Sequence, residues 1–158
     1  MIRPGTPEDA DSTARVQVET WQAAYAHALP AEKLAAVSVE SRAQGWRLRP
    51  PTFVAEESGV VVGFISVGRT RAEDADAELF ALYVHPSYWG AGIGRGLIEA
   101  GEEHLRALGH TSAILWVLDD NPRARRFYEL AGWSADGTAR NIELFGFHLP
   151  EVRYARSL

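Results

Sequence analysis

A run of four glycines at alternate positions is the feature that most constrains what this chain can fold into. Residues 78–84, just before it, are almost continuously apolar, which predicts a central strand covered on both faces of a sheet. Pro86 ends that strand because proline cannot donate a hydrogen bond to the ladder. Residues 92–108 then carry apolar side chains at helical spacing. The pattern therefore predicts a strand, a glycine-rich loop and a helix in direct succession.

This loop has the properties of an anion-binding site. Glycine lets the backbone turn tightly and lets a ligand approach the amide groups closely. The helix that follows presents N–H groups and the positive end of its dipole, which suit a pyrophosphate, and Arg95 can add a positive charge. A glycine-rich turn without a ligand is the structural alternative.

Two other phosphate-binding patterns fail at this loop. The dinucleotide fingerprint G-x-G-x-x-G would need its last glycine at Arg95 or Leu97. The P-loop pattern needs a lysine, and the only one in the chain, Lys33, lies far away. A nucleotide-binding enzyme is thereby disfavoured.

The remaining segments predict one α+β domain over residues 1–158, without repeats or linkers. A helix enters at Thr6-Pro7 and is interrupted at Pro30, and Ser58-Gly59 predicts the turn of a hairpin. Further helices are expected over residues 31–37, 41–48 and 122–131, and strands over residues 1–3, 52–56, 60–67, 113–118 and, as a pair, 133–157.

The composition excludes several classes of protein. No apolar stretch approaches the roughly 20 residues of a bilayer span, and no signal peptide is apparent, so we expect a cytoplasmic protein with no membrane partner. Without cysteine there is no disulfide, thiolate zinc site or cysteine nucleophile. The histidines lack H-x-x-x-H spacing, so no metal is expected. The net charge of −5 argues against nucleic acid and fits a cationic acceptor. The oligomeric state is open, with a homodimer as one option.

Two motifs resemble those of a known family. Residues 82–97 (L-x-V-x-P, then W-G-x-G-I-G-x-x-L) resemble the acetyl-CoA-binding motif of the GNAT superfamily of N-acyltransferases. Residues 121–133 (N-P-x-A-x-x-F-Y-x-x-x-G-W) resemble that family's second cofactor motif. The match is specific over residues 78–133 and looser over residues 2–29. It implies an α/β/α sandwich with a mixed central sheet of about six to seven strands, and an acetyl-CoA-dependent N-acetyltransferase.

The resemblance assigns cofactor contacts by position. In the first motif, Trp89 departs from the family, which usually has Arg or Gln there, and the usual side-chain contact from this position is in doubt. Main-chain groups would pair with the pantetheine arm of acetyl-CoA at Leu82, Tyr83 and Val84. The loop would hold the pyrophosphate through Gly90, Ala91, Gly92, Ile93, Gly94, Arg95 and Gly96. In the second motif the cofactor would be bonded by Asn121 and lined by Ala124, Phe127 and Tyr128.

Acetyl transfer to an amine needs a neutral amine, a donor for the oxyanion and a proton for the departing thiolate. Glu78 resembles the position where some members place a glutamate base, and a solvent-facing carboxylate is the equal alternative. It lies roughly 13 Å along the strand from Leu82, so it would act through water. Backbone N–H groups at a bulge near Leu82 would serve the oxyanion. Tyr128 resembles the family's proton donor, with an aromatic packed on its helix as the alternative.

The acceptor is the part of the reaction that the sequence leaves open. Trp21 and Tyr25 lie one helical turn apart and could wall an acceptor pocket, or be buried in the core. A peptide N-terminus, a protein lysine, a polyamine or an antibiotic would each supply the amine. Since no cysteine can carry the acetyl group, we expect direct transfer in a ternary complex. The rival function is a non-catalytic acyl-CoA sensor or interaction module of the same fold.

Overall fold

The computed structural model describes all residues, Met1–Leu158, and groups them into two compact units. The first unit comprises Met1–Val67 and Ala81–Gly101, and the second comprises Gly68–Phe80 and Glu102–Leu158. The hydrogen-bonded strands follow the order β1-β2-β3-β4-β5-β7-β6 in one mixed seven-stranded sheet. The fold is α+β, with the number of strands that the sequence predicts. Its organisation as one domain stays a prediction.

The first unit holds the N-terminal helices and the strands that pair with each other at the start of the chain. Its own elements are β1 (Ile2–Pro4), the 3₁₀ turn η1 (Pro7–Asp9), α1 (Ala10–Ala24), α2 (Ala31–Ala35), α3 (Val39–Leu48), β2 (Phe53–Glu57) and the 3₁₀ turn η2 (Pro86–Tyr88). Three further elements run from one unit into the other: β3 (Val60–Arg69), β4 (Ala77–Val84) and α4 (Ile93–Ala107).

The hairpin of β2 and β3 and its core confirm the predicted pattern in the first unit. Ser58 and Gly59 have φ values of 51° and 78°, the left-handed pair that a tight hairpin turn requires. A buried cluster joins α1 to these two strands and comprises Val16, Val54, Val61 and Phe64. The side chains of Trp46, Ala81 and Tyr83 pack against this cluster. Burying such apolar side chains provides the main stabilisation of the unit.

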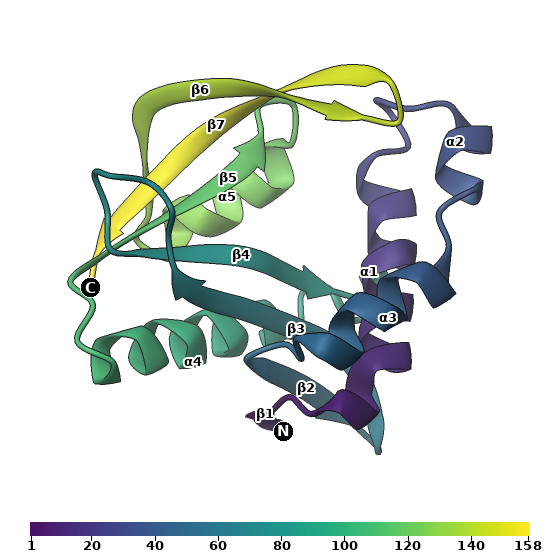
Figure 1. The fold of residues 1–158 in the computed structure, drawn as a ribbon, viewed down its shortest axis with the longest axis horizontal. Helices are drawn as coiled ribbons and strands as arrows, with labels where there is room; N and C mark the ends of the chain where they lie inside the picture. The colour runs from purple at the N-terminus through teal and green to yellow at the C-terminus, as the bar shows by residue number, and fades with distance from the viewer. The chain divides into compact units, whose positions relative to one another are not determined.

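The second unit is built around the C-terminal strands. Its own elements are β5 (Ser112–Leu118), α5 (Pro122–Leu130), β6 (Ser134–Leu144) and β7 (Phe147–Ser157). The strands β6 and β7 form a long antiparallel hairpin, drawn yellow-green and yellow in Figure 1, and β7 pairs along the whole of β5. Helix α5 begins where the Asn121 side chain accepts a hydrogen bond from Ala124 N–H, and it ends before Gly132, whose φ is 98°.

Two expectations drawn from the apolar pattern are wrong in detail. Strand β4 is central in the sheet order, yet Phe80 is 54% exposed, so the strand is not covered on both faces. Its parallel ladder with β5 joins only Ala77 and Glu78 to their partners. Leu108 has the helical spacing of α4 but lies past the end of the helix and is 61% exposed.

Candidate active site

The glycine loop opens helix α4 as the sequence predicts. Gly90 and Gly92 both have φ of 83°, a conformation that side chains other than glycine rarely adopt. A Cβ atom at either position would meet no other atom within 4 Å, so packing does not explain these glycines. The first intrahelical bond runs from Gly96 N–H to the Gly92 carbonyl, and the amides of Ile93 and Gly94 precede it at the start of the helix. The loop therefore presents backbone donors and open space, the two requirements of an anion cradle.

Two residues of the predicted cradle have other contacts in the structure. Arg95 donates to the carboxylate of Glu99 at 2.7 Å, which offsets part of the charge that it would bring to a phosphate. Gly96 uses its own amide inside the helix, and a Cβ there would lie 2.8 Å from the Ile2 side chain. Close packing against β1 accounts for this glycine.

Trp89, the position that departs from the family motif, makes a contact that the sequence did not indicate. Its indole Nε1–H donates to the Val84 carbonyl oxygen at 2.7 Å. The bond links the end of β4 to the residue before Gly90 and so closes the chain across His85 and the η2 turn. Trp89 therefore has a defined position on the loop, although it lacks the charge of an arginine.

The predicted acceptor residues meet the predicted cofactor strand within the first unit. Trp21 Nε1–H donates to the Tyr83 hydroxyl oxygen at 2.7 Å, and the Tyr25 ring packs edge-on against Trp21 with 5.4 Å between centroids. The guanidinium of Arg42, a residue of α3, lies over the Trp21 ring, 4.9 Å from its centre. Trp21 and Tyr25 are half-buried, so they are neither core residues nor fully exposed.

The second motif lies in the second unit, on α5. The Asn121 Oδ1 atom caps the helix by accepting from Ala124 N–H at 3.2 Å, which leaves the side-chain NH₂ group for another partner. Phe127 and Ala124 are half-buried. Tyr128 is 9% exposed and its ring packs against those of Phe127, Trp133 and Tyr154, with centroids 5.3 to 6.5 Å apart. The packing holds the Tyr128 ring in one orientation, so a structural role and a proton-donating role are both compatible with its surroundings.

Glu78 lies at the start of β4, in the second unit. Its Oε1 atom accepts a hydrogen bond from the Thr70 hydroxyl at 2.7 Å, and Thr70 is buried. The Glu78 side chain is half-buried. Its role as a base stays a prediction.

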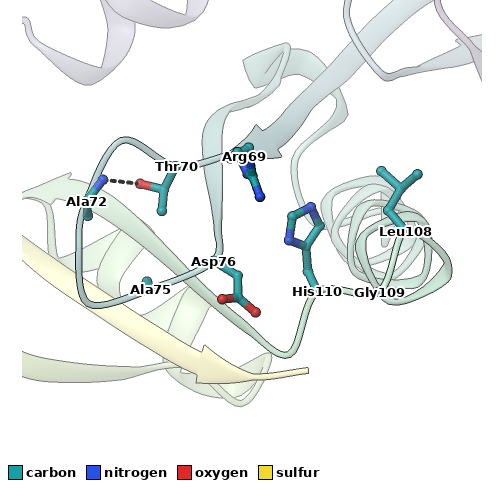
Figure 2. A pocket seen from close by; sticks show the side chains of 8 residues that line it. All are labelled: Arg69, Thr70, Ala72, Ala75, Asp76, Leu108, Gly109 and His110. Atoms are coloured by element: carbon teal, nitrogen blue, oxygen red, sulfur yellow. Dashed lines mark hydrogen bonds between the residues drawn. The ribbon is translucent and has the colours of Figure 1, made fainter.

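A separate surface hollow of about 520 Å³ lies in the second unit, after the C-terminal end of α4 (Figure 2). Figure 2 shows the Arg69, Asp76 and His110 side chains around it. Thr111 donates to the Asp76 carboxylate through its amide and its hydroxyl, at 2.9 and 2.8 Å, and these bonds lower the pKa of Asp76. None of the residues predicted for acetyl transfer lines this hollow.

Comparison with known proteins decides the family. The model of the acetyltransferase (GNAT) family matches residues 15–133 of the chain. The chain belongs to this family. The uncharacterized N-acetyltransferase YuaI of Bacillus subtilis (strain 168) is 33% identical over 157 residues, a match that covers 96% of this chain and 89% of YuaI. The predicted family and the enzyme class, an acetyltransferase, are thereby confirmed.

Two further proteins are similar to this chain. The mycothiol acetyltransferase of Propionibacterium freudenreichii is 35% identical over 122 residues, which are 73% of this chain but only 38% of that protein. The structure of PaiA N-acetyltransferase from Thermoplasma acidophilum in complex with coenzyme A has a TM-score of 0.79 and 21% identity, and the match covers 100% of this chain and 98% of that one. The second likeness shows the shared fold. No helix of this GNAT chain has the length and apolar character needed to cross a membrane.

Sequence reasoning missed three contacts in this GNAT chain. Arg42 belongs to no motif and lies on α3, whereas Trp21 lies on α1, so only the fold brings Arg42 over the Trp21 ring. The Trp89 bond to Val84 depends on the turn between them. Glu102 of α4 belongs to no motif, yet it is 6% exposed and accepts from Trp133 Nε1–H at 2.9 Å. The helical spacing of apolar residues in α4 gives no indication that the Glu102 carboxylate is buried.

Proposed function

We propose that this GNAT protein transfers an acetyl group from acetyl-CoA to a primary amine, directly and within a ternary complex. The observation that carries the proposal is the loop before α4, where two left-handed glycines with open space around them precede a helix start. The coenzyme A bound to the PaiA relative of the same fold supports the choice of acyl donor. The absence of cysteine from the chain supports transfer without an acetyl-enzyme intermediate.

The donor would be held mainly by main-chain groups. The amides of Ile93 and Gly94 would bind the pyrophosphate, with the dipole of α4 adding to their attraction for negative charge. The backbone of β4 at Leu82 and Tyr83 would pair with the pantetheine arm, and the Asn121 NH₂ group would donate to the same arm. Because these contacts use backbone geometry, they tolerate the unusual Trp89.

The amine must lose its proton before it can attack. A lysine-like amine has a pKa of about 10.4, so the neutral form costs roughly 4–5 kcal/mol at pH 7. Glu78 would accept the proton through a relay of water, since an extended strand separates it from Leu82. Its bond from Thr70 would hold the carboxylate in place while one oxygen still accepts.

Tyr128 would return a proton to the departing thiolate. A phenol with a pKa of about 10 can protonate a thiolate whose conjugate acid has a pKa of about 8.5 when the two are hydrogen-bonded. The aromatic rings of Phe127 and Tyr154 pack against the Tyr128 ring, which supports a defined position for its hydroxyl. The Tyr128 phenolate left by this step would take up a proton from solvent before the next turnover.

Binding and turnover test this function separately. Acetyl-CoA at 100 times its dissociation constant should stabilise the protein by about 2.7 kcal/mol in a thermal melt. Release of free thiol in the presence of an amine then measures transfer. We expect Tyr128→Phe to keep the affinity for acetyl-CoA, measured by calorimetry, and to lower kcat by at least about tenfold.

The control for Tyr128→Phe is Tyr154→Phe. The Tyr154 hydroxyl donates to Glu129 at 2.7 Å and accepts from Arg125 at 3.0 Å, so its loss should lower stability and leave kcat near that of the wild type. A melt that no acyl-CoA shifts would contradict the proposed function. Binding without thiol release for any amine would favour the sensor instead.

A further inference from the structure

Arg42 is an unusual arginine within the first unit. Five arginines of the chain are half-buried, and four of them form an ion pair with a carboxylate: Arg3 with Asp9, Arg125 with Asp119, Arg153 with Asp74, and Arg156 with Glu102. Arg42, the fifth, contacts the ring of Trp21 and forms no ion pair. A guanidinium without a carboxylate partner on the protein can pair with the negative charge of a ligand.

The chemistry of the Arg42 side chain suits an anionic ligand. A guanidinium that lies over an aromatic face is held by cation–π attraction, while its N–H groups point outward in the plane of the fork. That planar fork matches the two oxygens of a carboxylate or phosphate and can bind both at once. A guanidinium that lies on a ring and has no ion pair therefore suits an oxyanion as its ligand.

A chain of contacts connects this guanidinium to β4. Arg42 lies on Trp21, and Trp21 donates to the hydroxyl of Tyr83, which stands between Leu82 and Val84 on the strand proposed to hold the acetyl donor. All of these residues belong to the first unit. A group bound by Arg42 is thus on the part of the molecule where the acceptor is expected from Trp21 and Tyr25.

We propose that Arg42 selects an acceptor that carries an oxyanion, a carboxylate or a phosphate, in addition to its amine. The inference rests on the proposed amine acetylation and narrows its substrate class. A polyamine or another acceptor with several positive charges is repelled by Arg42, because nothing on the protein neutralises this guanidinium.

Matched pairs of acceptors test the inference through the release of coenzyme A thiol. The carboxylate arm compares amino acids with their carboxamides, and the phosphate arm compares O-phosphoethanolamine with ethanolamine. We expect the wild type to prefer the anionic member of at least one pair by about 10- to 100-fold in kcat/KM, as charge-assisted hydrogen bonds allow. Whichever arm shows the preference identifies the oxyanion.

Three variants separate the charge of Arg42 from its packing. Arg42→Met keeps an apolar stem over Trp21 and should remove the preference, chiefly by raising KM for the anionic acceptor. Arg42→Lys keeps the charge without the planar fork of the guanidinium and should keep part of the preference for the anionic acceptor. Arg49→Met is the control, because it removes the same charge from an exposed arginine at the end of α3 and should keep the preference.

Two results would overturn the inference and leave amine acetylation standing. One is a wild type that acetylates neutral amines or polyamines as well as anionic ones, and the other is an Arg42→Met protein with the wild-type preference. A protein that acetylates no amine would overturn both proposals.

Discussion

Trp89 shows how a single residue can replace a charged contact with a structural one. Family members usually place an arginine or glutamine at this position, whereas here an indole N–H holds the Val84 carbonyl at 2.7 Å. The bond fixes the loop before any ligand arrives, so less order has to be gained on binding. A loop that is already in place can bind a pyrophosphate with its amides alone.

Removing this bond should weaken the binding of acetyl-CoA. Trp89→Phe keeps an aromatic ring but loses the N–H donor, and we expect the dissociation constant to rise about three- to tenfold, the value of one hydrogen bond. Isothermal calorimetry measures the change, and S-acetylpantetheine, which lacks the pyrophosphate, should bind wild type and variant alike.

The control at this scale is Trp46→Phe. It removes an indole N–H that donates to Gln17 at 2.9 Å in the same unit, and should lower stability without changing the affinity for acetyl-CoA. Equal affinities of Trp89→Phe and the wild type would show that the bond does not prepare the loop.

Helix α4 illustrates two uses of glycine within one element. Gly92 at its start needs a left-handed backbone, while Gly101 inside it permits close packing. A Cβ on Gly101 would lie 2.7 Å from the Ile65 side chain and 3.2 Å from that of Val67, and Ile65 is fully buried. The helix therefore gives up some intrinsic stability in order to lie close to β3.

We predict opposite effects for two alanine substitutions in helices. Gly101→Ala should destabilise the protein by about 1–3 kcal/mol, because the added methyl overfills the core. Gly45→Ala in α3, where no atom lies within 4 Å of the new Cβ, should stabilise it by about 0.5–1 kcal/mol through helix propensity alone. Urea unfolding measures both, and a Gly101→Ala protein as stable as Gly45→Ala would refute the packing argument.

At the scale of the whole molecule, ion pairs and hydrogen bonds make the fold sensitive to acid. The Arg3 guanidinium lowers the pKa of the buried Asp9, hydrogen bonds from Arg153 lower the pKa of Asp74, and Thr111 lowers that of Asp76. Because these folded-state pKa values lie below the usual 3.8, the unfolded chain takes up protons first as the pH falls. The stability that these carboxylates contribute is complete well above the unfolded pKa of 3.8. It is lost as the pH falls from there through their folded-state pKa values.

We therefore expect the melting temperature to fall as the pH is lowered from about 5 to 3. Asp9→Asn should melt lower than the wild type at neutral pH and show a smaller fall with acid, since it no longer titrates. Asp11→Asn, which changes an exposed carboxyl paired with Arg47 at the surface, should stay close to the wild-type curve because exposed ion pairs contribute little. A pH dependence unchanged by Asp9→Asn would exclude the Arg3 pair as a cause.

The sequence by itself determined the family, the α+β class and the order of most elements. The reason is physical: the glycine loop and the Asn121 cap are local, and backbone amides need little more than a left-handed glycine and a helix start to become a binding site. Hairpin turns are local too, which is why the sequence predicts the turn at Ser58-Gly59 that the structure shows.

Only the tertiary structure decided which side chains meet. Arg42 and Trp21 stand on different helices, and Tyr83 is 62 residues along the chain from Trp21, so no spacing in the sequence could indicate their contact. The exposure of Phe80 depended in the same way on what other segments cover. Long-range packing sets these distances, and with them the chemistry that an acceptor will encounter.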